Sequence, residues 1–256
     1  MGRIRTIARR TFLIGSAAIA GGVAFGAYMY NREENPLLTD LQPGTAAITP
    51  YVKIDADGVT LITPRTDMGQ GAYSMQAMLI AEELDVDLDQ IRVDPGMPSA
   101  TYYNTGFAEE GAPFRSTDTG LAAETTRDMI NVLIKFLGLQ VTGGSTSVPD
   151  GFDKLREAGA VARETLKKAA SEETGIAVSL LKTERGAVVL PDGSRKTYIE
   201  LAPTAAEITP VRNVTLRDPS KWRLIGKEIK RHDIIAKSTG TQDYGIDVTM
   251  DGMVYA

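Results

Sequence analysis

The sequence predicts an α+β fold, because signals for hairpins and signals for helices alternate along the chain. Between residues 52 and 61, apolar residues alternate with polar ones on both sides of Asp57-Gly58, which is a strong hairpin pattern. Between residues 152 and 169, apolar residues recur every three or four positions, as on an amphipathic helix. Strand patterns at 186–190 and 196–201 flank a Pro-Asp-Gly-Ser turn and predict a second hairpin.

The elements between these patterns follow from local signals. A linker with proline and glycine occupies 35–50, and the strongly apolar segment Ala72–Leu84 has the length and composition of a buried helix. Residues 91–93 predict a short strand. Scattered Gly and Pro at 97–120 predict a long irregular loop, which either covers the core or lines a substrate funnel. The segment Leu121–Leu137 predicts a helix that ends at the following glycine.

Composition restricts the chemistry that this chain can perform. An apolar fraction of 43% over 256 residues is that of a globular protein with a core. The formal net charge is −5, and five arginines lie within the first 34 residues, so the rest of the chain is more acidic still. This balance argues against nucleic acid as a partner. Because the chain has no cysteine and one histidine, it excludes disulfides, iron–sulfur clusters of its own and multi-histidine metal sites.

The N-terminal residues have the pattern of an export signal. Arg9-Arg10 stands directly before Thr11–Tyr30, a segment without any charge, which is typical of twin-arginine signals. That route exports folded proteins, often with a cofactor already inserted. Ala18-Ile19-Ala20 is a candidate cleavage site, but the uncharged segment is also long enough to span a bilayer. We therefore expect residues 1–34 to be a twin-arginine signal or an uncleaved anchor, with an ordinary Sec signal as the alternative.

Two glycine-rich turns each stand before a predicted helix, where exposed backbone N–H groups can bind an anion. Neither turn has a Walker or dinucleotide-binding pattern, and a helix cap is an equally good interpretation of the second. In the first turn, Gln70 between two glycines could recognise an oxo group or a carbonyl, or face water. The candidate site residues are Met68, Gly69, Gln70, Gly71, Thr142, Gly143, Gly144, Ser145, Thr146 and Ser147.

Several motifs together resemble one family. They are Asp67-Met68-Gly69-Gln70-Gly71, Ala81-Glu82-Glu83-Leu84, the turn Thr142–Ser147, Leu155-Arg156 with Ala158-Gly159-Ala160, and the stretch from Trp222 to Val248. In combination they resemble the molybdenum-binding large subunits of the xanthine dehydrogenase and aldehyde oxidase superfamily. The resemblance is to the exported type that is similar to isoquinoline 1-oxidoreductase beta subunits. It runs from about residue 54 to the end of the sequence.

The resemblance implies a domain organisation and a cofactor. Residues 51–215 would form part of a molybdopterin-binding domain, and residues 216–256 the start of a hammerhead-like α/β domain. The cofactor would be molybdopterin cytosine dinucleotide, with Gln70 facing the oxo end of the molybdenum and the Gly143–Ser147 turn contacting the pterin or its pyrophosphate. The cofactor brings its own sulfur ligands, which agrees with a chain without cysteine. By the same resemblance, [2Fe-2S] clusters belong to a small partner subunit, and a c-type cytochrome could accept the electrons.

The implied activity is that of a periplasmic molybdenum hydroxylase, which oxidises aldehydes or N-heterocyclic aromatics with water as the oxygen source. Family members are much longer, and their catalytic base is a glutamate in a Gly-rich C-terminal motif beyond Ala256. We therefore expect an N-terminal part of the large subunit without a catalytic residue, since Glu82, Glu83, Glu109 and Glu110 do not stand in that motif. The alternatives are a non-catalytic fragment or assembly module, and a membrane-anchored binding protein unrelated to molybdenum.

Overall fold

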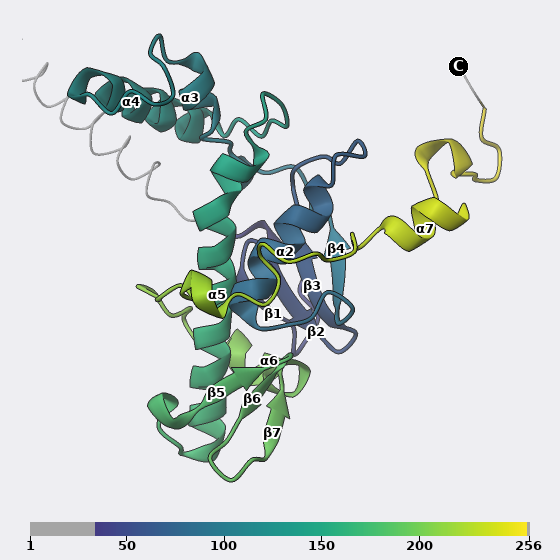
Figure 1. Cartoon of the computed structure of the whole chain (residues 1–256). Coiled ribbons are helices and arrows are strands. Elements are labelled where there is room, and N and C mark those ends of the chain that lie inside the picture. Colours follow the sequence, from purple (N-terminus) through teal and green to yellow (C-terminus); the bar gives the residue numbers. More distant parts are fainter. Residues whose placement is uncertain (1–33, 255–256) are drawn as a thin grey trace, which may run out of the picture. The chain divides into compact units, whose positions relative to one another are not determined.

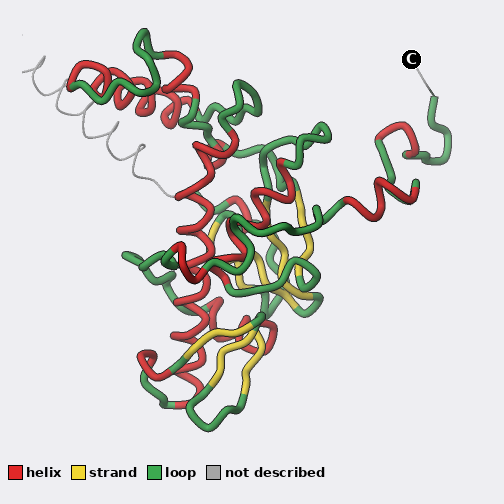
Figure 2. Tube along the Cα trace, viewed as in Figure 1, coloured by secondary structure: helices red, strands yellow, loops and turns green. Residues whose placement is uncertain are grey.

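The computed structural model describes residues 34–254, so Arg9-Arg10 and Thr11–Tyr30 of the predicted export signal lie outside the described residues. Within the described range the α+β prediction is confirmed, because helices and short strands alternate along the chain (Figure 1; Figure 2). The chain forms two compact units. The insert unit holds the described residues up to Asp40 together with Met97–Asp150. The sheet unit holds Leu41–Gly96 and the described residues from Gly151 onward.

A four-stranded sheet forms the centre of the sheet unit. Its strands, side by side in this order, are β1 (Ala46–Thr49), β2 (Val52–Asp55), β3 (Gly58–Ile62) and β4 (Ile91–Asp94). The pairs β1–β2 and β2–β3 are antiparallel, whereas β3 and β4 are parallel. The first predicted hairpin is confirmed, since Asp55 pairs with Gly58 across the turn. Residues 46–49, which were predicted as part of the linker, form the edge strand β1.

Helix α2 (Ala72–Leu84) connects β3 to β4, and its predicted bounds are confirmed. Most of its apolar side chains are buried, and Ala77, Ile80 and Leu84 have no exposed surface. The helix stops at Asp85, whose φ of 64° lies in the left-handed region. This helix supplies the parallel connection between β3 and β4, as expected for a crossover of this kind.

Helix α5 (Ser147–Thr174) begins in the insert unit and continues in the sheet unit, where it packs against α2. It contains the predicted amphipathic segment and buries Leu155, Leu166 and Ala169. The two helices come so close at Gly159 that a Cβ there would lie 2.3 Å from the carbonyl oxygen of Ile80. Only glycine fits at this approach, because interiors at native density leave no room for an added methyl group.

A smaller antiparallel sheet follows α5. Its elements are η3 (Val178–Leu180), β5 (Lys182–Glu184), β6 (Ala187–Val189) and β7 (Arg195–Thr197). The pairing of β6 with β7 confirms the second hairpin, but the predicted extension of its second strand to Leu201 is wrong. Helix α6 (Tyr198–Ala206) begins there instead, because the Thr197 hydroxyl accepts from the Glu200 N–H while the Glu200 carboxylate accepts from the Thr197 N–H. The motif of this capping box, Thr-x-x-Glu, can be recognised in the sequence.

The described part of the insert unit is helical. Its elements are η1 (Pro36–Leu38), η2 (Ala100–Tyr102), α3 (Phe107–Gly111) and α4 (Leu121–Leu137). The predicted helix 121–137 is confirmed, and it ends at Gly138, whose φ is 60°. The predicted loop 97–120 contains η2 and α3. Among residues 34–254, no helix is long and apolar enough to cross a membrane.

Beyond α6 the chain runs along the sheet unit with little regular structure. We call residues 211–225 the strap; it includes η4 (Pro219–Lys221). Helix α7 (Ile234–Thr239) and η5 (Gly245–Asp247) follow it. The predicted domain boundary between residues 215 and 216 therefore falls inside the strap, and it stays a prediction.

Candidate functional site

The first candidate turn, Met68–Gly71, leads into α2 in the sheet unit. Gly69 and Gly71 have φ values of 100° and 89°, a region that side chains rarely adopt. A Cβ at Gly69 would meet nothing within 4 Å, so the backbone at this point is open on that side. Met68 is 82% exposed, and Gln70 is exposed as well. The turn is therefore open at Gly69, directly before the N-terminus of α2.

Asp67 holds this turn in shape. Its side chain is 1% exposed, and its carboxylate accepts hydrogen bonds from the Gly69 N–H (2.7 Å) and the Tyr73 N–H (3.0 Å). Arg231 and Lys237 lie 3.6 and 3.8 Å from the same carboxylate. Burial raises the pKa of Asp67, but the two N–H donors and the two cations outweigh it, so the pKa lies below its ordinary value. An ionised Asp67 thus fixes the turn against the start of α2.

The side chain of Gln70 folds back onto its own turn. Its Oε1 accepts from the Met68 N–H (2.5 Å), and its Nε2 donates to the Thr66 carbonyl oxygen (2.9 Å). Both polar groups of the amide therefore have partners within the turn. To face a ligand, as the sequence predicts, Gln70 would have to exchange these local hydrogen bonds for new ones. Its proposed role stays a prediction.

A segment far along the chain completes the first turn. Arg231 donates to the Gly69 carbonyl oxygen (2.8 Å) and forms an ion pair with Asp233 (2.9 Å). Next to it, the His232 N–H donates to Ser74 Oγ near the start of α2 (2.9 Å). In the sequence this region stands out only as a family motif, and its contact with the turn was not predicted. The one sequence feature that could have indicated this contact is the alternating charge of Arg231, Asp233 and Lys237.

The second candidate turn, Thr142–Ser147, lies in the insert unit and leads into α5. Gly144 and Ser145 have φ values of 59° and 56°. The buried hydroxyl of Thr146 donates to the Gly143 carbonyl oxygen (2.7 Å) and accepts from Asn104 Nδ2 (2.8 Å). Thr146 is thus occupied in closing the turn, while Gly143, Gly144 and Ser145 are exposed.

The loop residues 104–106 brace the second turn from behind. Asn104 Nδ2 also donates to the Val141 carbonyl oxygen (2.9 Å), and its Oδ1 accepts from the Gly106 N–H (2.9 Å). A Cβ at Gly106 would lie 2.6 Å from the Cβ of Thr146, so these two segments touch. Thr105 donates twice to the Asp150 carboxylate in the first turns of α5. Sequence patterns did not indicate this bracing, because the segment shows no regular period.

The structure therefore brings Met68–Gly71 together with Asp67 and Arg231, and Thr142–Ser147 together with Asn104. The two turns belong to different units of the chain. In residues 34–254, no group of three or more His, Cys, Asp or Glu side chains is placed to hold a metal ion.

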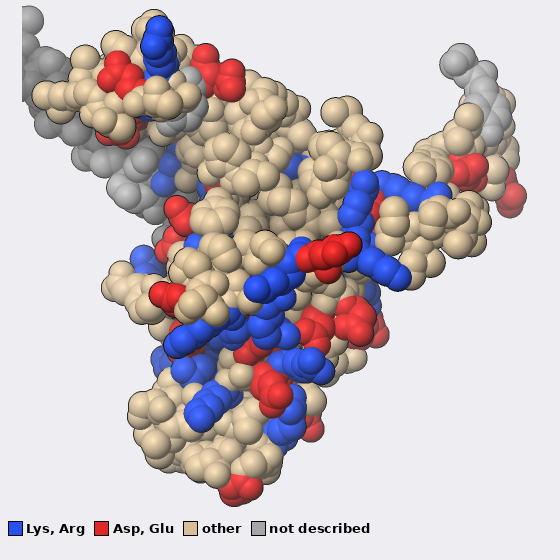
Figure 3. Space-filling model, viewed as in Figure 1, with Lys and Arg blue, Asp and Glu red and all other residues tan. Residues whose placement is uncertain are grey.

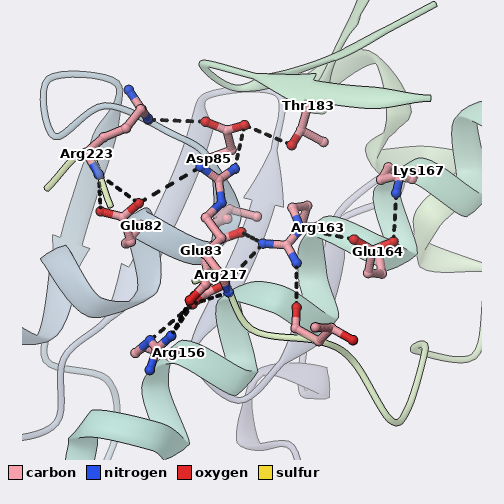
Figure 4. A network of polar contacts seen from close by, with 12 residues as sticks. Glu82, Glu83, Asp85, Arg156, Arg163, Glu164, Lys167, Thr183, Arg217 and Arg223 are labelled. Atoms are coloured by element: carbon pink, nitrogen blue, oxygen red, sulfur yellow. Dashed lines mark hydrogen bonds and ion pairs between the residues drawn. The ribbon is translucent and has the colours of Figure 1, made fainter. Parts of the chain in front are cut away.

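Two neighbouring glutamates at the end of α2 bind the strap (Figure 4). The Glu82 carboxylate accepts from the N–H groups of Arg223 (2.9 Å), Leu224 (2.6 Å) and Ile225 (3.2 Å). Three consecutive backbone donors around one carboxylate form a complete anion nest. Glu82 is fully buried, and its contacts are those of a structural group.

Glu83, also fully buried, joins the strap to α5. Its carboxylate accepts from Arg156 (2.8 Å), Arg163 (3.2 Å) and the Arg217 N–H (2.9 Å). Asp85 extends the network through an ion pair with Arg217 (2.7 Å). Figure 3 shows Lys and Arg side chains gathered over the sheet unit.

Several known proteins are similar to this chain in sequence. Residues 8–137 match the family model of a molybdopterin cofactor-binding domain. The chain is similar to the beta subunit of isoquinoline 1-oxidoreductase from Brevundimonas diminuta, with 30% identity over 98% of this chain and 33% of that protein. It is also similar to a membrane-bound aldehyde dehydrogenase (pyrroloquinoline-quinone) from Gluconacetobacter polyoxogenes, with 29% identity over 98% of this chain and 29% of that protein.

A third similar protein is a subunit of nicotinate dehydrogenase from Pseudomonas putida, with 26% identity over 80% of this chain and 14% of that protein. The chain thus spans about a third or less of the length of these relatives. Two of the three are named as subunits, so they work in complexes of more than one chain.

Proposed function

Because this chain belongs to the molybdopterin cofactor-binding domain family, we propose that it forms part of the cofactor site in the large subunit of a molybdenum hydroxylase. The family match confirms the resemblance that the sequence motifs indicated, and it supports a molybdenum–molybdopterin cofactor. The cytosine dinucleotide form of that cofactor is the finer part of the proposal.

The residues present fit such a group. The open backbone at Gly69, where a Cβ would meet no atom within 4 Å, is the observation that carries the proposal. Gly69, and Gly71 beside the Arg231 side chain, would let the cofactor approach the N-terminus of α2. The Gln70 amide would recognise its oxo end. When bound, the cofactor would supply the redox chemistry and its own sulfur ligands, which suits a chain without cysteine.

The second turn would hold the anionic end of the cofactor. Gly143 and Gly144 leave the backbone accessible, and the Ser145 hydroxyl adds a donor beside the N-terminus of α5. Because Thr146 and Asn104 already bond to each other, we assign them to the shape of the turn and not to the ligand. Backbone N–H groups at a helix start would favour a pyrophosphate in this place.

We propose that the complete enzyme oxidises an aldehyde or an N-heterocyclic aromatic compound with water as the oxygen source. The names of the three relatives, which refer to isoquinoline, an aldehyde and nicotinate, support this substrate class. We further propose a small [2Fe-2S] subunit as partner and a c-type cytochrome as electron acceptor. Arg9-Arg10 supports export by the twin-arginine translocase to the periplasm, with Thr11–Tyr30 as a membrane anchor if it is not cleaved.

The test measures turnover and molybdenum content separately in the purified complex. Gln70→Ala should lower turnover while the molybdenum content stays full, whereas Gly144→Val should lower the molybdenum content. Val at a φ of 59° is strained whatever the space around it, and its side chain would also contact Glu110.

Matched controls are Gln90→Ala, an exposed glutamine whose amide also makes two hydrogen bonds to backbone groups, and Gly193→Val, a glycine with φ 85° in open space. Unchanged kinetics for Gln70→Ala, or full molybdenum occupancy for Gly144→Val, would contradict the assignment. A complex that binds molybdenum but turns over no substrate of either class would instead favour a cofactor-binding assembly module.

A further inference from the structure

Helix α4 exposes an unusually apolar face. Leu121, Met129 and Phe136 are 85%, 70% and 57% exposed, and Val132, Leu133 and Leu137 are exposed as well. At 100° per residue these positions project to one half of the helix, together with Ala122, Thr125 and Thr126. That half carries no charged residue.

The charges and the core contacts of α4 lie on the other half. Ala123 and Ile134 are buried, and Arg127 is buried with its guanidinium donating to the carbonyl oxygens of Arg115 and Asp118. The exposed face is therefore additional to the face that packs into the insert unit. Soluble proteins rarely leave an apolar patch of this kind exposed, so we expect another molecule or surface to cover this face of α4.

The position of Glu34, the first described residue, suggests what covers this face. The Thr101 hydroxyl donates to the Glu34 carbonyl oxygen (2.7 Å), which ties the start of the chain to η2. Element η2 in turn lies at the end of α4, because a Cβ at Gly138 would be 2.4 Å from the Cβ of Ala100. The uncharged segment of the export signal ends at Tyr30, and four residues of chain reach at most about 14 Å. An anchored segment would therefore hold α4 beside the lipid surface.

We propose that the apolar face of α4 lies on the outer surface of the bilayer, next to the anchor. The inference rests on the anchoring part of the proposed function. Lys135 and Tyr103 suit the edge of such a contact, since the ammonium lies 5.8 Å from the ring centre and both side chains combine an apolar body with a polar end. Because the face is uncharged, we expect contact with neutral lipid and little dependence on salt.

The absence of cysteine allows a direct test in the full chain, because one introduced cysteine is the only site for a thiol label. Leu133→Cys and Phe136→Cys place a polarity-sensitive fluorophore on the apolar face, and Asp128→Cys places it on the charged half as a matched control. In vesicles of phosphatidylcholine that carry a quencher on the lipid tails, we expect at least ~10-fold stronger quenching at 133 and 136 than at 128.

Three outcomes overturn the inference. Equal, weak quenching at all three positions means that water covers the face, and a blue-shifted but unquenched label means that protein covers it. Quenching that appears only with phosphatidylglycerol and disappears in salt means that charge, and not the apolar face, makes the contact. A label at Ala20→Cys separates the two proposals: if it is quenched while 133 and 136 are not, the anchor stands and only the α4 contact fails.

Discussion

Replacing Glu83 by glutamine should lower the free energy of unfolding of the sheet unit more than a substitution of the same size at an exposed position does. Its carboxylate is fully buried between Arg156 and Arg163, whose side chains are 7% and 9% exposed. The substitution keeps the shape but removes the negative charge that these two guanidinium groups share. Breaking a buried ion pair by removing one partner costs about 3–5 kcal/mol, because it leaves the other charge uncompensated. That is a large part of the roughly 5–15 kcal/mol that stabilises a domain.

The assay is urea unfolding of the full chain, with Glu173→Gln as control. Glu173 also pairs with a cation, Lys196 (2.7 Å), but both side chains are partly exposed, and such pairs contribute about 0–1 kcal/mol. We expect Glu83→Gln to lower the unfolding midpoint strongly without changing the slope, which reports the area exposed on unfolding. A loss no larger than that of Glu173→Gln would refute the reasoning that the strap depends on this charge.

Two further predictions concern the helix contact and the first turn. Gly159→Ala should destabilise the chain by about 1–3 kcal/mol in urea, since its Cβ would strike the Ile80 carbonyl, and Gly151→Ala in the same helix, which meets only a flexible leucine, should not. Asp67 has a lowered pKa in the folded state, so its stabilising effect is present above the ordinary value of 3.8 and is lost as the pH falls through the lower folded value. Asp67→Asn should therefore flatten the acid limb of the stability profile, measured by urea unfolding from about pH 5 to about pH 2, and an unaltered limb would speak against the contacts described.

The elements that the sequence predicts well are those with local causes. Helix α4 has its predicted bounds because glycines stand at both ends, and α2 begins after Gly71 as predicted. The first hairpin follows from Asp57-Gly58. The strand predicted through Leu201 fails for an equally local reason, the capping box at Thr197, which the apolar alternation obscured. In each of these cases the local sequence determines where the element begins or ends. The failed prediction overlooked a local signal that the sequence does contain.

The strap and the braces of the two turns could not be predicted in this way. Their shape is set by partners far away in the sequence: Glu82 for the strap, Arg231 for the first turn and Asn104 for the second. The conformation of irregular segments depends on tertiary contacts. Because such segments have no hydrophobic periodicity, the sequence does not predict that conformation. The sequence located both candidate turns, but not the residues that hold them.

The strap also bears on the order in which this protein is made. Glu82 and Leu224 are 142 positions apart, so during synthesis the carboxylates of α2 leave the ribosome long before their backbone donors. Until then these glutamates have to remain hydrated, because burying an unpaired carboxylate is costly. The centre of the sheet unit therefore closes only once the strap residues from Arg217 onward have been made, and long-range closure of this kind is slow. Under the proposed export of a folded protein, this late contact would mark when the sheet unit has closed.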